Sequence, residues 1–318
     1  MFHGFVIRYP LTINIAKPAH KIVKRWILTA CIAVLVILLL ALILFSAETA
    51  RVRVATTTSL YATSLLENLA EAFTSSYNDV AFDFIAVGSG EALRRAEMGD
   101  ACLVFVHAPS LEKQYISKNV IIDQRIVAYN YFIVVGPFSD PAEVLNAESA
   151  LDAFKKIYQA GERGEAFFVS RGDSSGTHLK ELSIWNKAGL DPRGKAWYKE
   201  TGSGMSQTLL IAQELKAYTI SDIGTYLKFR EKVPDLKILY EGGEDLINIY
   251  SVYLVSSCAG EELKASLRFM EFVSREAQEI IESYGVDEFG KQLFYPARDR
   301  LPWLESMWRR LADLGEAS

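Results

Sequence analysis

Three segments of the sequence combine small hydroxyl residues with glycine at the point where an apolar, strand-like run ends. Thr56-Thr57-Thr58-Ser59 follows RVRVA, Gly88-Ser89-Gly90 follows FDFIAV, and RGDSSGT (171–177) follows AFFVS. A helix that begins at such a segment presents free backbone N–H groups and the positive end of its dipole. Ends of this kind attract anions, so the three segments together predict an oxyanion site.

The ordinary alternative is that these hydroxyl residues only cap their helices, which is what Ser and Thr usually do at such positions. Three segments at the carboxyl ends of strands favour a ligand site, because open α/β sheets bind ligands there. Arg171 adds a guanidinium that can present two parallel N–H donors to an oxyanion. Asp173 is interpreted as the carboxylate that orients Arg171, since an acid facing the anion would repel it.

The elements that position these segments alternate along the chain. Helical patterns at 65–73 and 179–185 lie between runs rich in Val, Ile, Phe and Tyr. The clearest strands are predicted at 51–55, 82–87, 103–106, 126–135, 166–169 and 249–255. This alternation predicts an α/β fold with parallel sheets flanked by helices. About 270 residues follow the N-terminal segment, which suits two lobes better than one core.

Composition and charge exclude several classes of protein. The chain of 318 residues is 50% hydrophobic and 23% charged, which excludes a disordered chain. Residues 1–47 contain five basic residues and no acid, while the whole chain has a net charge of −5, so residues 48–318 carry −10. A nucleic-acid-binding protein needs a basic face that displaces counterions from phosphates. We therefore expect no nucleic-acid partner.

The N-terminal part contains a membrane segment. Residues 26–45, WILTACIAVLVILLLALILF, form an uncharged run long enough as a helix to cross a hydrocarbon core of roughly 30 Å. Basic residues lie directly before it and Glu48 lies after it, which places the N-terminus in the cytoplasm. The expectation is a cytoplasmic segment at 1–25 and a transmembrane signal anchor at 26–46.

A cleaved signal peptide is the alternative to this anchor. The apolar run is longer than the usual signal core, and no clean small-x-small cleavage site follows it, so we favour the anchor. Both interpretations place the remaining chain outside the cytoplasm. The anchored form is a single-pass protein of the cell membrane with an extracytoplasmic C-terminal domain.

The cysteines and histidines predict no metal or cofactor site. Cys31 lies in the membrane segment, and Cys102 and Cys258 each border an apolar run. Those two could pair only if their strands are neighbours, and we expect two buried free thiols. No zinc-ligand spacing is present, and His107 and His178 are the histidines outside the N-terminal segment.

A larger set of motifs resembles a known family. In order along the chain these are ATTTS (55–59), FIAVGSGEAL (84–93), GDA (99–101), VHAP (106–109), VVGP (134–137), SRGDSSGTH (170–178), WYKETGSGM (197–205) and AYTISDIGTYL (217–227). As a set they resemble the substrate-binding proteins of tungstate ABC transporters, which are related more distantly to phosphate- and molybdate-binding proteins. The resemblance implies that the protein is not an enzyme, and that its partners are tungstate or molybdate and an ABC permease.

The same resemblance implies a two-lobed Venus-flytrap fold of the periplasmic-binding-protein type (type II). Two crossing strands, near 126–135 and 249–255, connect the lobes, which close on the anion. We expect lobe 1 to comprise residues 47–130 and 250–318, and lobe 2 to comprise residues 131–249.

The resemblance also assigns the anion-binding residues, in agreement with the three segments described above. The first donor loop contributes Thr57, Thr58 and Ser59, the second Ser89, and the third Arg171, Ser175 and Thr177. Ser174 is expected to contribute through its backbone. The stretch Gly202–Met205 is either a fourth contact or a glycine-rich turn before an ordinary helix.

His107 bears on which anion is bound. In phosphate-binding relatives the corresponding stretch offers an aspartate that accepts the proton of hydrogen phosphate, and here Val106-His107-Ala108-Pro109 replaces it. A fully deprotonated dianion needs donors alone. His107 either serves this selectivity directly or hydrogen-bonds a neighbouring backbone group. A phosphate or sulfate carrier remains the alternative among binding proteins.

A serine hydrolase is the alternative from another class. Gly172 to Gly176 fits G-x-S-x-G and His178 lies close by. We expect His178 to lie in the first turn of the following helix and to point away from Ser174. A hydrolase would also leave Arg171 and the other two donor loops unexplained.

Overall fold

The computed structural model describes Met1, residues 19–44 and residues 49–313, with the side chains of residues 24–37 in the first helix. The chain divides into two compact units, Met1–Glu48 and Thr49–Ser318. In the first unit, α1 spans Ala19–Leu44. Among the described residues, no helix is both long and apolar enough to cross a membrane. The predicted anchor at 26–46 extends beyond the described residues, and the predicted segment at 1–25 lies mostly outside them.

The second unit alternates strands with helices, as the sequence predicts. Its strands are β1 (Ala50–Thr57), β2 (Val80–Val87), β3 (Leu103–Val106), β4 (Ile121–Pro137), β5 (Phe168–Ser170), β6 (Tyr198–Glu200), β7 (Thr219–Asp222), β8 (Leu236–Glu241), β9 (Ile247–Val255) and β10 (Tyr295–Pro296). Its helices are α2 (Thr58–Ala62), α3 (Leu65–Ser76), α4 (Ser89–Glu97), α5 (Pro109–Ser117), α6 (Ala150–Glu162), α7 (Gly176–Lys187), α8 (Met205–Leu215), α9 (Ile223–Phe229), α10 (Gly260–Ser274), α11 (Gln278–Ser283), α12 (Val286–Phe289) and α13 (Leu301–Asp313).

The main sheet is mixed. Strand β1 lies between β2 and β3 and is parallel to both, whereas β9 is antiparallel to its neighbours β3 and β4. Strands β5 and β6 form a separate parallel pair. The prediction of parallel sheets is therefore correct for β1, β2 and β3 and for the β5–β6 pair, and wrong for β4 and β9, whose pairs are antiparallel. Strand–helix alternation does not reveal the direction of a strand that joins the sheet beside a partner far away in sequence.

Strand β4 crosses from one part of the main sheet to another. Up to Tyr131 it pairs with β9 and β10, and from Phe132 it pairs with β7 and β8. We call β1, β2, β3, β9 and β10, with β4 up to Tyr131, the first half-sheet. We call β7 and β8, with β4 from Phe132, the second half-sheet. Ile247, the first residue of β9, lies opposite Tyr131, so β9 begins at the level where β4 changes its partners.

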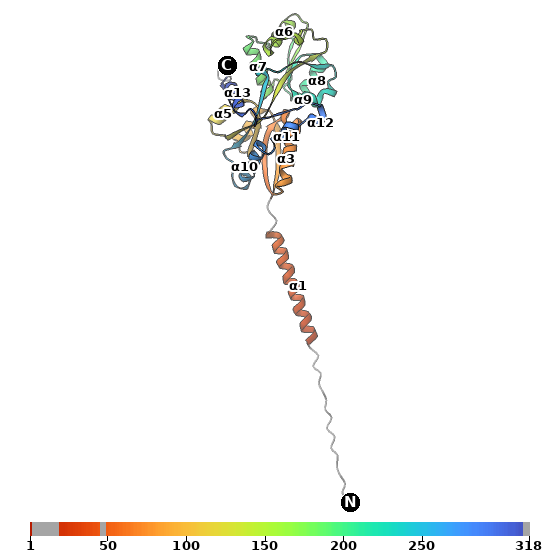
Figure 1. Cartoon of the computed structure of the whole chain (residues 1–318), viewed down its shortest axis with the longest axis vertical. Helices are drawn as coiled ribbons and strands as arrows, with labels where there is room; N and C mark the ends of the chain where they lie inside the picture. Colours follow the sequence, from red (N-terminus) through yellow and green to blue (C-terminus); the bar gives the residue numbers. More distant parts are fainter. Residues whose placement is uncertain (2–18, 45–48, 314–318) are drawn as a thin grey trace. The chain divides into compact units, whose positions relative to one another are not determined.

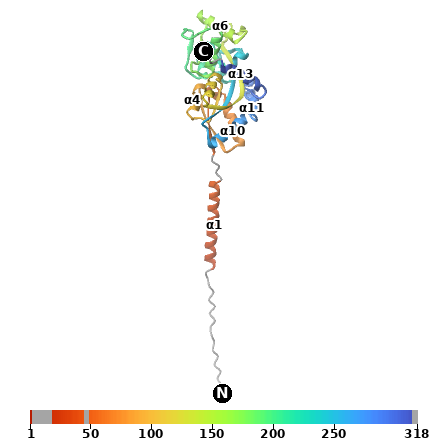
Figure 2. The same ribbon diagram turned by 90° about the vertical axis from the view of Figure 1, so that its left-hand side faces the viewer.

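Helices cover the two half-sheets separately (Figures 1 and 2). Helices α3 and α10 lie at one end of the second unit and α6 at the other, with α7 and α8 toward that other end in Figure 1. Phe73 of α3 packs edge-on against Phe269 of α10, with 5.3 Å between ring centroids. Near the second half-sheet, the ring centroid of Phe154 of α6 lies 4.5 Å from that of Trp185 of α7. The two ring pairs belong to two separate hydrophobic clusters.

Cys102 and Cys258 form a disulfide, with their Cα atoms 5.1 Å apart. The expectation of two free thiols is wrong because β3 and β9 are neighbours: Cys102 precedes β3, and Leu103 pairs with Leu254. Cys31 is a free cysteine.

Candidate functional site

The three predicted donor loops all lie where a strand leads into a helix. Loop 1 joins β1 to α2, loop 2 joins β2 to α4, and loop 3 joins β5 to α7. The first two loops follow strands of the first half-sheet. Loop 3 follows β5, whose backbone exchanges hydrogen bonds with Tyr218, the residue just before β7. The carboxyl ends of strands and the amino ends of helices thus meet at one place, as an anion site requires.

Close approaches link the loops to one another. A Cβ atom on Gly90 of loop 2 would lie 3.8 Å from the carbonyl oxygen of Ser174 in loop 3. Loop 1 contacts the segment after β3 through Ser59 Oγ, which lies 3.3 Å from His107 Nε2. A Cβ atom on Gly176 would lie 2.9 Å from His107 Nδ1, so only glycine fits at the start of α7. The predicted loops therefore surround a common point.

The structure also brings the possible fourth contact to this point. Helix α8 begins at Met205, and its cap, Gly204, provides no side-chain hydrogen bond. A Cβ atom on Gly204 would lie 3.8 Å from Thr58 Oγ1. Thr58, Ser59, Gly204 and Met205 also line one cavity of about 370 Å³.

Some of the predicted residues cap helices, as the alternative reading proposed. Thr57 Oγ1 accepts a hydrogen bond from the backbone N–H of Leu60 at 3.2 Å. Ser175 Oγ accepts one from the backbone N–H of His178 at 3.3 Å. A hydroxyl group that caps a helix accepts a hydrogen bond through its oxygen. Its proton can still be donated to another acceptor.

Four other predicted residues hold buried donors that the fold does not use. Within the described part of the chain, Thr58 Oγ1, Ser89 Oγ, Arg171 Nε and Thr177 Oγ1 are buried without a hydrogen-bond partner. A buried polar atom left unpaired costs about 1–3 kcal/mol, so most folds avoid it. All three loops contribute to this set. A ligand made of acceptor oxygens would satisfy all four atoms.

Arg171 is buried and held as predicted. Its side chain is 3% exposed, and its Nη2 donates to Asp173 Oδ2 at 2.5 Å. Asp173 Oδ1 accepts the backbone N–H of Ser175 at 3.2 Å, which ties the carboxylate into loop 3. With Nη2 held in this way, Nε remains unpaired among the described residues.

Ser174 and His178 contact each other. The backbone N–H of Ser174, which is expected to face the anion, donates to His178 Nδ1 at 3.0 Å and so already has a partner in the fold. The imidazole of His178 points back toward loop 3 rather than away from it. Ser174 is exposed and adopts a positive φ of 57°. The hydrolase reading gains no support, because His178 is engaged by the backbone of Ser174 and not by its hydroxyl group.

His107 is a neutral residue inside the site. Burial, together with the positive charge of Arg171, lowers the pKa of His107 to about 3. The centroid of its ring lies 5.0 Å from the ring centroid of Tyr250 and 6.2 Å from that of Phe132. A neutral imidazole adds no charge to the site.

Three supporting residues carried no signal that would have revealed their role from sequence. Buried Glu112 accepts the backbone N–H of Ala108 at 2.6 Å and so holds the segment that carries His107. Lys180 of α7 donates to the carbonyl oxygen of Asp245 at 3.1 Å, and burial lowers its pKa to about 7. Asn248 sits in β9. Single charged or amide residues in helices and strands give no pattern until the fold brings them together.

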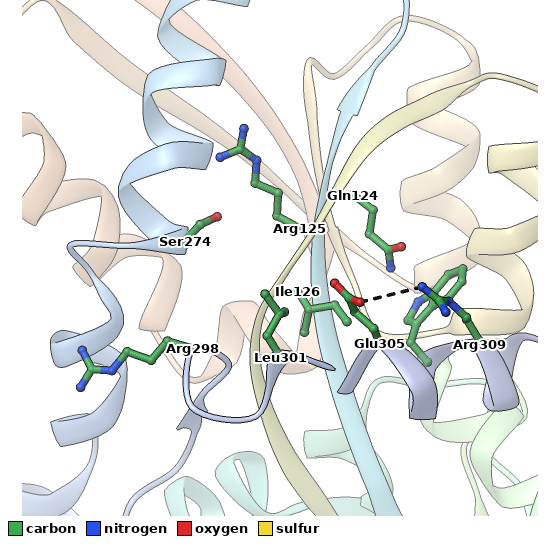
Figure 3. A pocket seen from close by; sticks show the side chains of 9 residues that line it. Gln124, Arg125, Ile126, Ser274, Arg298, Leu301, Glu305 and Arg309 are labelled. Atoms are coloured by element: carbon green, nitrogen blue, oxygen red, sulfur yellow. Dashed lines mark ion pairs between the residues drawn. The ribbon is translucent and has the colours of Figure 1, made fainter. Parts of the chain in front are cut away.

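A separate cavity of about 300 Å³ differs in kind from this site (Figure 3). Gln124 and Arg125 of β4 and Glu305 and Arg309 of α13 are among the residues that line it. Its arginines already have acidic partners: Arg309 lies 3.8 Å from Glu305, the pair drawn in Figure 3, and Arg125 bonds Glu271 at 2.5 Å. In contrast to Arg171, Arg125 is half-buried and Arg309 is exposed.

Comparison with known proteins places this geometry in a family. Residues 46–276 match the model of the PBP superfamily domain, which is more than half of the chain. The chain belongs to this superfamily. The tungstate-binding protein TupA of Peptoclostridium acidaminophilum is 36% identical over 247 residues, which are 76% of this chain and 84% of that protein.

Solved structures agree with the assignment to the PBP superfamily. The tungstate ABC transporter protein from Geobacter sulfurreducens has a TM-score of 0.65 and 38% identity, covering 74% of this chain and 98% of that one. The tungstate-binding protein TupA from Desulfovibrio alaskensis G20 has a TM-score of 0.66 and 36% identity, covering 77% and 98%. The α/β periplasmic-binding-protein-like fold predicted from the sequence is thereby confirmed.

Proposed function

We propose that the protein captures tungstate, or the closely similar molybdate, and delivers it to an ABC permease. The observation that carries this proposal is the set of buried, unpaired donors on Thr58, Ser89, Arg171 and Thr177. A tetrahedral dianion with four acceptor oxygens satisfies such a set. The relatives named above, which are tungstate-binding proteins of ABC transporters, support the choice of anion.

The proposal also includes the arrangement of the chain. Residues 47–130 and 250–318 form lobe 1 and residues 131–249 form lobe 2, with β4 and β9 crossing between them. The anion enters between the lobes and closes them.

Residues 26–46 anchor the protein in the cell membrane, with residues 1–25 in the cytoplasm and the C-terminal domain outside.

Calorimetric titration of the full-length protein with tungstate, molybdate, sulfate and phosphate tests this proposal. We expect one anion per chain, with tungstate and molybdate binding more tightly than sulfate and phosphate. Binding to the native state must also raise the melting temperature. Absence of both heat and thermal stabilisation with all four anions at millimolar concentration would overturn the proposal. Phosphate as the tightest ligand would replace tungstate with the phosphate-carrier alternative.

A further inference from the structure

Two asparagines face each other next to the point where β4 leaves the first half-sheet. Asn130 of β4 and Asn248 of β9 are direct partners in the strand register, one residue before Tyr131, the last residue of β4 that pairs with β9. Both are buried, at 0% and 2% exposure. Buried amides need defined partners for every donor and acceptor, because each group left unpaired is destabilising.

A backbone carbonyl fixes how these two amides are oriented. Asn130 Nδ2 donates to the carbonyl oxygen of Leu293 at 3.2 Å, and a carbonyl can only accept. Asn130 therefore turns its Oδ1 to Asn248, whose Nδ2 donates to it at 3.0 Å. The second proton of Asn248 Nδ2 goes to the hydroxyl oxygen of Tyr250 at 2.7 Å. Rotating the Asn248 amide by 180° would place two carbonyl oxygens against each other.

This orientation leaves Asn248 Oδ1 as an acceptor in need of a donor. Among the described residues, Asn248 Oδ1 and His107 Nδ1 are both buried without a hydrogen-bond partner, so each is available to the other. His107 and Asn248 line the same small cavity, of about 50 Å³. Burial lowers the pKa of His107, while the neighbouring side chain of Asn248 opposes that lowering. Because a neutral imidazole carries one N–H, a proton on Nδ1 leaves Nε2 as an acceptor.

The direction of two hydroxyl groups in loop 1 follows from this tautomer. Ser59 Oγ lies 3.3 Å from His107 Nε2, so the Ser59 hydroxyl must donate to the imidazole. Thr57 Oγ1 lies 3.3 Å from Ser59 Oγ, whose own proton is then already used, so Thr57 donates to Ser59. Both protons point into the protein.

We propose that a one-way hydrogen-bond chain runs from Thr57 through Ser59, His107, Asn248 and Asn130 to the carbonyl oxygen of Leu293. In this chain Asn248 is a positioning residue, and the hydroxyls of Thr57 and Ser59 hold loop 1 in place instead of donating to the anion. The chain joins the anion site to both crossing strands. Its meaning for anion binding rests on the proposed function, whereas the tautomer of His107 does not.

The tautomer is tested directly by NMR of the full-length protein labelled with ¹⁵N at histidine. Long-range proton–nitrogen correlations distinguish a ring nitrogen that carries a proton from one that carries a lone pair. We expect His107 to be protonated on Nδ1 in the parent, and Asn248→Leu to shift the proton toward Nε2. A parent protein with the proton on Nε2 would overturn the chain. His107→Gln identifies the signals of His107 by their loss.

Binding supplies a second arm with a matched pair of substitutions. Ser59→Ala and Ser89→Ala remove the same hydroxyl, but only Ser89 Oγ is unpaired among the described residues of the fold. Calorimetry with tungstate should show about a tenfold or greater loss of affinity for Ser89→Ala, as expected for a hydrogen bond to a charged group, and a loss below about threefold for Ser59→Ala. Equal losses would overturn the assignment of Ser59. A parent that binds no tungstate would overturn the proposed function and leave the NMR arm to decide the chain.

Discussion

Arg171 brings a positive charge into a part of the chain that is acidic overall. Its guanidinium is 3% exposed and is held by Asp173, so its direction is fixed before an anion arrives. Attraction between charges is strong at such a buried position because water screens it little. Arg171 should therefore contribute more to anion affinity than any single hydroxyl of the loops.

Substitution of Arg171 tests this contribution. Arg171→Lys keeps the charge and loses the planar pair of donors, and Arg171→Ala also leaves Asp173 without its partner. We expect calorimetry with tungstate to show about a ten- to hundredfold weakening for Arg171→Lys and a larger one for Arg171→Ala. Arg125→Ala is the control, because Arg125 lies outside the three donor loops and already pairs with Glu271. Parent-like affinity in Arg171→Ala together with lost binding in Arg125→Ala would place the anion elsewhere.

The selectivity of the site follows from the types of atom that surround it. The carboxylate of Asp173 is engaged by Arg171 and by the backbone of Ser175, so it is not free to accept a proton from a ligand. Hydrogen phosphate carries a P–O–H group, which needs a hydrogen-bond acceptor. In this site that group would face hydrogen-bond donors instead. We expect phosphate to bind at least about a hundredfold more weakly than tungstate in a competition titration at pH 7. Comparable affinities would show that an acceptor faces the anion.

At the scale of elements, close contact between loop 3 and the segment after β3 depends on Gly176. A Cβ atom there would lie 2.9 Å from both Nδ1 and the backbone oxygen of His107. Overpacking of this kind costs about 1–3 kcal/mol, so Gly176→Ala should weaken tungstate binding about tenfold or more. Gly90→Ala is the comparison, because its Cβ would make ordinary contacts at 3.8 Å. Gly176→Ala and Gly90→Ala with the same affinity would show that the loops need not approach so closely.

Glu112 joins three elements and should make stability depend on pH. Its carboxylate accepts hydrogen bonds from Ala108 before α5, from Tyr253 of β9 and from Trp308 of α13. Burial raises its pKa from an ordinary value of 4.5 to about 7, although these bonds oppose the rise. Between these values the folded state binds more protons than the unfolded state, so stability is lost as the pH rises from about 4.5 through 7.

Denaturation by urea between pH 4.5 and 8 measures this effect. The free energy of unfolding of the parent, taken relative to Glu112→Gln, should decrease as the pH rises across that window. Glu305→Gln at an exposed position of α13 provides the control and should leave the pH profile of the parent unchanged. A difference between parent and Glu112→Gln that does not change with pH would contradict the raised pKa.

The disulfide joins β3 and β9 at the ends of the first half-sheet. The bridge spans 156 residues, and cross-links over long loops stabilise proteins by about 2–4 kcal/mol. We expect the Cys102→Ala/Cys258→Ala double variant to unfold at a lower urea concentration by a corresponding amount. The parent in reducing buffer should behave in the same way. Unchanged stability in both cases would show that the bond does not form in the protein.

Local patterns predicted the elements of the site but not their pairing. The donor loops were visible because each strand end is followed at once by hydroxyl residues and a helix, as at Thr57 and Ser89. The first residues of β4 were missed because polar Asp123 and Gln124 interrupt the apolar run, which a shift of strand register accommodates. The disulfide and the Asn130–Asn248 pair depend on which distant strands become neighbours, and no local pattern contains that information.

At the scale of the whole molecule, the proposed attachment to the membrane concerns the N-terminal segment. An uncharged run of twenty residues with basic residues before it favours an uncleaved anchor. We expect mass spectrometry of native material from the membrane fraction to find peptides from residues before 26. An N-terminus that begins near residue 47 would show cleavage instead and would remove the anchor from the account.

The central claim is that one tetrahedral oxyanion binds where the three donor loops meet. Anomalous X-ray diffraction from crystals of the protein grown with tungstate locates the heavy atom without reference to any assumed contact. The account predicts one tungsten peak per chain, within hydrogen-bonding distance, through its oxygens, of Thr58, Ser89, Arg171 and Thr177. A peak at another place, such as the arginine-lined cavity of Figure 3, or no peak at all, would contradict it.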